Sequence, residues 1–134
     1  MNVKNIDAHM LRDLLDEARI STKKDDDGDL MTILAADEDF PHDVILWYML
    51  DGNWLTIIAR SFEFKLDDPV TVANDYNRGH RGVACIGEPD NGTIYFKLGF
   101  LLDEEVSTTY ILENCIKFGT SCSWRSFCDI YQGK

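Results

Sequence analysis

The densest group of potential metal ligands in the chain is the acidic stretch DDDGD, residues 25–29. Closely spaced carboxylates beside a glycine are typical of EF-hand calcium loops, in which the glycine stands sixth. With Gly28 as the sixth position, the first and twelfth fall on Lys23 and Leu34, and both of those positions need carboxylates. The stretch therefore predicts a hairpin turn and no metal site.

Histidine is the most common general base in enzymes, and the chain has three, His9, His42 and His80. No Gly-x-Ser-x-Gly motif, phosphate-binding glycine loop or His-Glu-x-x-His motif accompanies them. We expect solvated histidines, no catalytic residues and no cofactor. One alternative stays open, a small hydrolase or transferase that uses His42 or His80 with neighbouring carboxylates.

The four cysteines follow the patterns of buried secondary structure. Cys85 lies in a strand pattern, and Cys115, Cys122 and Cys128 lie in a helical one. No Cys-x-x-Cys pair occurs, so neither zinc binding nor a redox pair is indicated. Because unpaired cysteine is among the most buried residue types, we expect reduced, unligated thiols in the core.

The charge of the chain excludes several kinds of partner. Thirteen Lys and Arg against 24 Asp and Glu give a net charge of −11. Nucleic acids and anionic membranes are bound through clusters of Lys and Arg, so neither is expected as a partner. No apolar stretch approaches the roughly 18 residues of a membrane span, and the N-terminus has no hydrophobic leader pattern. These features predict a cytoplasmic protein with one domain, residues 1–134.

Periodicity and turn residues predict the order α-β-β-β-β-α-β-β-α. The expected elements are a helix over 6–18 capped by Asp7, hairpins at 19–36, 44–60 and 81–102, a helix from Pro69 to Gly79, and a long helix from Ser107 to about residue 131. The segment 37–43 is expected to be a polar loop. The apolar face of the last helix is expected to consist of Ile111, Leu112, Cys115, Phe118, Cys122 and Phe127. This order predicts an α+β fold, with an antiparallel sheet and helices mainly on one face.

The strand at 44–50 is apolar on both of its faces. Val44, Leu46, Tyr48 and Leu50 alternate with Ile45, Trp47 and Met49, and Trp54 begins the next strand. An antiparallel sheet with one solvated face normally shows a clean alternation of apolar and polar residues. Either the chain covers both faces itself, or one face contacts another molecule. We favour the second reading, with Ile45, Trp47, Met49 and Trp54 as the candidate interface.

Several segments in this order resemble the YbjN-like family, bacterial proteins regarded as candidate sensory-transduction regulators. They are ARISTKKDDDGDL, the apolar hairpin, VTVANDYNRG, and GVACIGEPDNGTIYFKLGFLLDEEVSTTYILENCIKF. The resemblance spans about residues 8–131. It implies an α+β fold similar to type III secretion chaperones, no known enzyme activity, and a structural role for Asn77. The three tryptophans and four cysteines depart from the family pattern.

Together these features predict a non-enzymatic protein-binding module, a regulator or chaperone-like protein that acts through a hydrophobic sheet surface. We expect a protein partner or client, and a homodimer as the commonest symmetric arrangement. A dedicated type III secretion-type chaperone is the alternative within the same class.

Overall fold

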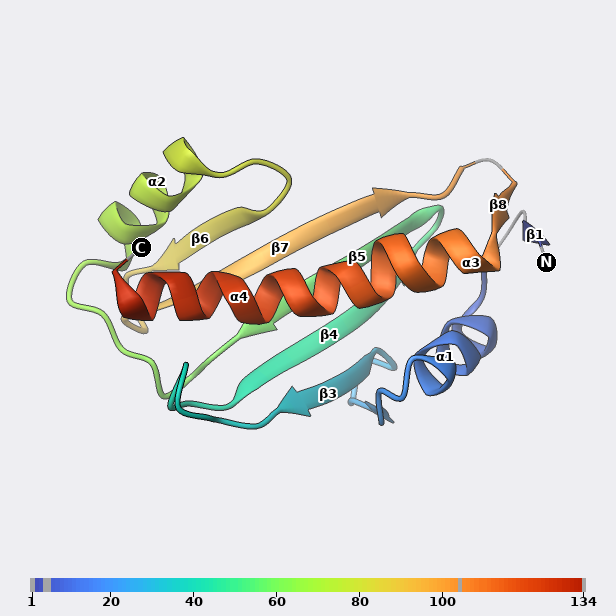
Figure 1. Ribbon diagram of the computed structural model, residues 1–134, viewed down its shortest axis with the longest axis horizontal. Helices are drawn as coiled ribbons and strands as arrows, with labels where there is room; N and C mark the ends of the chain where they lie inside the picture. The colour runs from blue at the N-terminus through green and yellow to red at the C-terminus, as the bar shows by residue number, and fades with distance from the viewer. Residues whose placement is uncertain (1, 4–5, 104, 134) are drawn as a thin grey trace.

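An antiparallel six-stranded sheet with the strand order β2-β3-β4-β5-β7-β6 is the frame of the molecule (Figure 1). The computed structural model describes residues 2–3, 6–103 and 105–133. The strands of the sheet are β2 (Lys23–Lys24), β3 (Leu30–Leu34), β4 (Val44–Asp51), β5 (Trp54–Arg60), β6 (Ala84–Glu88) and β7 (Thr93–Leu101). A short pair, β1 (Asn2–Val3) and β8 (Val106–Ser107), forms a second sheet that the sequence did not predict.

The helices are α1 (Ala8–Glu17), α2 (Pro69–Gly79) and a long C-terminal helix made of α3 (Thr108–Tyr110), the π-helical η1 (Ile111–Lys117) and α4 (Phe118–Gln132). The α+β fold with an antiparallel sheet is confirmed. Within the described residues, no helix combines the length and the apolar character that a membrane span needs.

The predicted caps and turns position these elements. The Asp7 side chain accepts a hydrogen bond from the Met10 amide at 2.9 Å, and Asp68 accepts one from the Thr71 amide at 3.2 Å. Pro69 occupies the first position of α2, where its missing amide proton costs nothing. The hairpin at the acidic stretch is confirmed, although β2 is shorter than predicted. Gly28 closes this hairpin with a positive φ of 86°.

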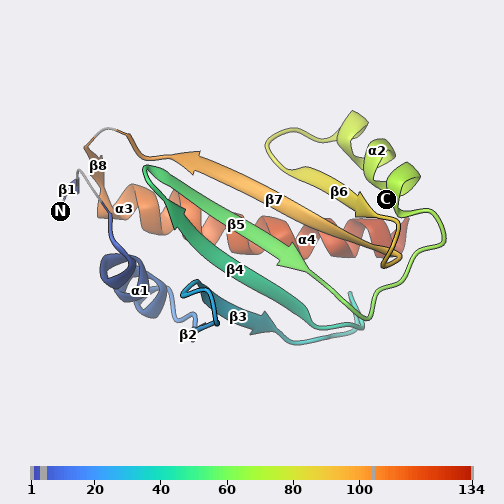
Figure 2. The same ribbon diagram turned by 180° about the vertical axis from the view of Figure 1, so that it is seen from behind.

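The C-terminal helix crosses one face of the sheet diagonally, and α1 and α2 lie near opposite ends of this helix layer (Figures 1 and 2). Alternate side chains of the three central strands are buried under the helices. They are Val44, Leu46 and Tyr48 of β4, Leu55, Ile57 and Ala59 of β5, and Ile94, Phe96 and Leu98 of β7. Gly119 lets α4 approach β5, because a Cβ atom at Gly119 would overlap Cδ1 of Ile57.

The predicted apolar face of the last helix is wrong at Phe118, whose side chain is 54% exposed. Gly119 and Ser123 are buried instead. The cause is the π-helical segment η1, which holds more residues per turn than an α-helix and shifts the buried face by about one residue.

The loop between β3 and β4 is not uniformly polar, which corrects the prediction for residues 37–43. Phe40 is fully buried, and its ring centroid lies 5.1 Å from that of Phe64 and 5.3 Å from that of Phe127. The carboxylate of Asp37 accepts the amide of Phe40 at 3.1 Å and shapes the turn that inserts this ring. Phe40 therefore anchors the loop beneath the end of α4.

Candidate functional site

The sheet face opposite the C-terminal helix is the main candidate surface (Figure 2). We call it the open face. Its residues are Met31 and Ile33 of β3, Ile45, Trp47 and Met49 of β4, Trp54, Thr56, Ile58 and Arg60 of β5, Tyr95, Lys97, Gly99 and Leu101 of β7, and Phe62. The helices of the described residues pack against the other face or at the ends of the sheet.

The structure brings the four predicted interface residues to this one face. Ile45, Trp47 and Met49 are half-buried, whereas their neighbours Val44, Leu46 and Tyr48 are at most 1% exposed. Trp54 is 48% exposed. The two-sided apolar pattern of β4 therefore corresponds to one face in the core and one face without a helix over it.

Exposed apolar side chains from other segments enlarge the face, and the sequence analysis missed them. Ile33 is 53% exposed, and Phe62 and Leu101 are 48% exposed. Trp47 contacts Phe62 edge-to-face at 6.4 Å between ring centroids. Leu101 lies opposite Trp54 in the register of β5 and β7. The strand pattern of residues 93–102 is the only feature of the sequence that bears on Leu101. It predicts that side chains alternate between two faces, and the register of β5 and β7 is needed to place Leu101 on the open face.

One of the cations on this face is already engaged. Arg60 forms an ion pair with Glu88, and its guanidinium carbon lies 4.2 Å from the ring centroid of Tyr95. Both partners of the ion pair are about three-quarters buried. Arg60 therefore ties β5 to β6 and β7 and has little remaining capacity to bind a ligand anion.

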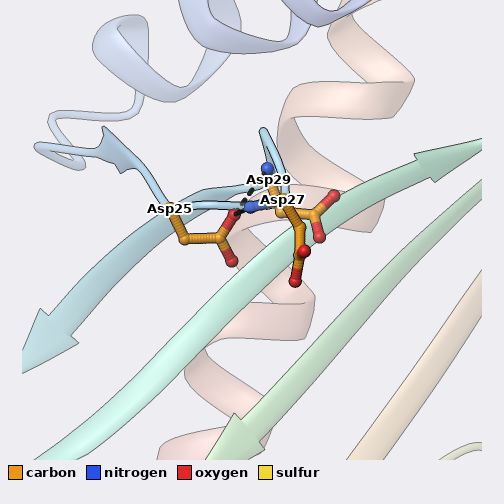
Figure 3. Close-up of side chains that lie close together, drawn as sticks. All are labelled: Asp25, Asp27 and Asp29. Atoms are coloured by element: carbon orange, nitrogen blue, oxygen red, sulfur yellow. Dashed lines mark hydrogen bonds between the residues drawn. The ribbon is translucent and has the colours of Figure 1, made fainter.

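At one end of the open face, three carboxylates of the β2–β3 turn converge (Figure 3). One ligand oxygen from each of Asp25, Asp27 and Asp29 lies within 4.8 Å of the others. Asp25 Oδ1 accepts the amides of Asp27 at 3.0 Å and Asp29 at 2.9 Å, which fixes the turn. Partial burial, and then the charges of Asp25 and Asp27, raise the pKa of the Asp29 carboxyl.

These carboxylates form one wall of a pocket of about 280 Å³, which we call the acidic pocket. Its lining residues are Asp25, Asp27, Asp29, Trp47, Met49, Ile58 and Arg60. The remainder of the lining is thus part of the open face. The EF-hand comparison did not anticipate this pocket, because its apolar lining depends on how the turn packs beside β4 and β5.

The histidines are dispersed, and two of them contact aromatic rings. His42 lies half-buried against Phe40, with 5.4 Å between ring centroids, so the expectation that it is solvated is wrong. His80 stacks on Tyr76 at 3.8 Å, and its Nδ1 lies 2.8 Å from the Tyr76 carbonyl oxygen. Exposed His9 lies 3.5 Å from Asp13. His80 shares a pocket with Asp75, but no serine, threonine or cysteine is among the described residues that line it.

The cysteines lie where the patterns placed them, on β6 and along the C-terminal helix. Cys85, Cys115 and Cys128 are buried, and Cys122 is half-buried. Burial raises the pKa of the Cys85 thiol to about 12 and that of Cys115 to about 11. Buried thiols with raised pKa values are poor nucleophiles, because the reactive form is the thiolate.

Asn77 has a structural role at the sheet edge. Its amide nitrogen donates to the Cys85 carbonyl and its oxygen accepts the Cys85 amide, both at 2.8 Å. The side chain therefore occupies hydrogen-bonding positions that an additional strand would use beside β6. These two hydrogen bonds link α2 to β6, and they agree with the structural role that the resemblance implies for Asn77.

The fold of the chain is similar to that of a solved structure. The crystal structure of "YbjN, a putative transcription regulator from E. coli" superposes with a TM-score of 0.63 over 93% of this chain and 88% of that chain, at 14% sequence identity. The chain has a YbjN-like fold. No family model and no curated protein matches the sequence. At this identity the YbjN-like likeness concerns the fold alone, and it agrees with the resemblance seen in the sequence.

Proposed function

We propose that the chain is a non-enzymatic protein-binding module that acts through the open face of its sheet. The observation that supports this proposal is the one-sided cover of the sheet. Helices bury alternate side chains of β4 and β5, while Trp54, Phe62 and Leu101 on the other face remain about half exposed. Large exposed apolar patches on soluble domains are typical of interaction sites.

The energy available at such a face is sufficient for association. Burial of apolar surface contributes about 25 cal/mol per Å². A patch of several hundred Å² therefore contributes several kcal/mol, from which the entropy cost of association is subtracted. The half-exposed aromatic side chains Trp54 and Phe62 are of the type that dominates binding energy at interfaces.

A non-enzymatic role is supported by the dispersed histidines and by the raised pKa values of the thiols. The solved structural neighbour is described as "a putative transcription regulator", which supports a regulatory role for this chain. A chaperone-like role in the cytoplasm and a homodimer are part of the proposal, and a dedicated secretion-type chaperone is its alternative. These finer assignments rest on the sequence resemblance and on the open face.

Site-specific photo-crosslinking in cells tests the proposal. A photo-reactive amino acid at Trp47 samples the open face, and the same group at Tyr131 samples the exposed side of α4, where that tyrosine is 47% exposed. We expect a discrete adduct from position 47 that is absent from position 131, and mass spectrometry identifies the partner or a second copy. Equal, diffuse labelling from both positions would contradict a dedicated binding face.

Paired charge substitutions on β4 provide a second test. Trp47→Glu places a charge on the open face and should weaken association while the fold survives. Tyr48→Glu places it in the core and should unfold the domain, because an unpaired buried charge is costly. Light scattering measures association and circular dichroism measures folding. Unfolding by both substitutions, with a monomeric wild type, would mean that both faces are closed within one chain.

A further inference from the structure

The acidic pocket has a charged part and an apolar part, and the proposed function accounts only for the apolar part. One wall carries the carboxylates of Asp25, Asp27 and Asp29, and the rest includes the apolar groups of Trp47, Met49 and Ile58. Lysine and arginine side chains have the matching construction, an aliphatic stem that covers apolar surface and a cationic end that binds carboxylates.

The charges in the pocket lack a compensating cation within the part of the chain that the structure describes. None of the four ion pairs found there includes Asp25, Asp27 or Asp29, and Arg60, which also lines the pocket, is paired with Glu88. Three carboxylates whose oxygens lie within 4.8 Å of one another repel each other. Partial burial first, and then this repulsion from Asp25 and Asp27, raises the pKa of the Asp29 carboxyl. A cation placed among them would relieve it.

We propose that a lysine or arginine side chain of a bound protein segment docks in the acidic pocket, with its stem against Trp47, Met49 and Ile58 and its charged end among the three aspartates. This inference rests on the proposed function and names the partner chemistry of the same face. The segment carries apolar residues beside the basic one, because exposed Trp54 and Phe62 are available on the surrounding face.

Charge complementarity favours a basic segment of a different protein, over a second copy of this chain, as the occupant of the acidic pocket. Each copy carries a net charge of −11, so two copies repel one another at long range. The same field attracts a basic segment and accelerates its association, in a way that salt weakens. A bare metal ion would satisfy the carboxylates but leave the apolar lining without a contact.

Selection from a random-peptide phage library tests the inference with defined probes. We expect wild-type protein to enrich peptides in which lysine or arginine is flanked by apolar residues. The variant D25N/D27N/D29N should lose this preference. Asparagine keeps the Oδ1 acceptor that holds the turn amides, so the hairpin is retained. The control D16N/E17Q/D90N makes the same change in charge at exposed positions away from the pocket and should keep the preference.

The best peptide is then synthesised with its basic residue and with glutamine in that place, and both affinities are measured by fluorescence anisotropy. We expect the glutamine peptide to bind wild-type protein about tenfold more weakly, as for the loss of a charge-assisted hydrogen bond, and to bind D25N/D27N/D29N as well as the basic peptide does. Raising the salt concentration should weaken the binding of the basic peptide to wild-type protein the most.

The outcomes separate this inference from the proposed function. Peptides without a basic preference whose binding is lost in Trp47→Glu would overturn the inference and keep the open face as a binding surface. Failure to select any peptide, or binding unaffected by Trp47→Glu, would overturn both. Saturable calcium binding that displaces the peptide would assign the pocket to a metal. A wild-type dimer that Trp47→Glu dissociates would agree with the proposed homodimer, and it would overturn this inference only if the selected basic peptide failed to bind in competition with the second copy.

Discussion

Tyr48 of β4 and Thr120 of α4 join the sheet to the helix layer, with 2.7 Å between the phenol oxygen and Oγ1 of Thr120. Thr120 Oγ1 donates its own proton to the Ile116 carbonyl, also at 2.7 Å, so the phenol is the donor in the first bond. The Tyr48 side chain is 1% exposed. This chain of hydrogen bonds reaches the helix at the junction of η1 and α4.

Removal of this hydroxyl should destabilise the fold without emptying the core. Tyr48→Phe keeps the ring and loses one buried hydrogen bond, so we expect the free energy of unfolding to fall by about 1 kcal/mol. Tyr110→Phe makes the same chemical change at a side chain that is 43% exposed, and should have almost no effect. Urea denaturation measures both. Equal stability of Tyr48→Phe and wild type would contradict a net contribution from this bond.

Stability should decline in alkaline solution. Burial raises the pKa of Tyr48 to about 12, against 10.0 for an ordinary tyrosine, and that of Cys85 to about 12, against 9.0 for an ordinary thiol. The unfolded chain releases these protons at the ordinary values, so the associated stability is complete below about pH 9 and is lost as the pH rises towards 12. Each such group should contribute a slope of about 1.4 kcal/mol per pH unit within its window.

Denaturation curves at successive pH values between 8 and 12 measure this decline. Tyr48→Phe should show a shallower decline above pH 10, because it lacks one of the titrating groups. A stability that is flat across this range would contradict the predicted protonation of the buried groups.

Local patterns in the sequence predicted much of the fold. The two-residue period of residues 44–50, and the caps Asp7 and Asp68, depend on interactions within a few residues, and the structure reproduces them. Trp47 and its neighbours on β4 were assigned to a single face by the same periodicity, and they lie on one face. Their function as an interface stays a prediction.

The features that the sequence did not predict depend on contacts between distant segments. The pairing of β1 with β8 joins residues about one hundred positions apart. The burial of Phe40 requires Phe64 and Phe127, and a seven-residue loop pattern cannot report them. The phase shift that exposes Phe118 comes from η1, whose residues are compatible with an ordinary α-helix. The acidic pocket requires both the turn conformation and the position of Trp47.

The cysteines should be reduced and unligated in the native protein. Three are buried, and burial raises all four thiol pKa values. Intact mass under native and denaturing non-reducing conditions should equal that of the four-thiol chain. A mass lower by two hydrogen atoms, which indicates a disulfide, or a mass higher by one zinc ion would contradict the prediction. A thiol reagent should react slowly with native protein and completely after unfolding in urea.

Calcium should not bind at Asp25, Asp27 and Asp29 with physiological strength, even though their carboxylates converge. Lys23 and Leu34 occupy the two positions at which an EF-hand loop supplies carboxylates. Calorimetric titration of the metal-free protein with calcium should give no saturable heat, and D25N/D27N/D29N should give the same baseline. A site of micromolar affinity that this variant loses would contradict the prediction.

The approach of α4 to β5 at Gly119 gives the sharpest test of the packing. Alanine normally stabilises a helix interior by about 1 kcal/mol relative to glycine. At Gly119, however, the new Cβ would overlap Cδ1 of Ile57, whose side chain is fully buried. We therefore expect Gly119→Ala to lower the free energy of unfolding by about 1–2 kcal/mol, as overpacking of a filled core does.

Gly79→Ala is the matched control, since a Cβ at this last position of α2 meets open space. It should leave stability unchanged or raise it. Ile57→Val removes the overlapping methyl group, so the double variant should be more stable than the sum of the two single effects predicts. Additive effects, or a stabilising Gly119→Ala, would show that α4 does not pack this closely on the sheet.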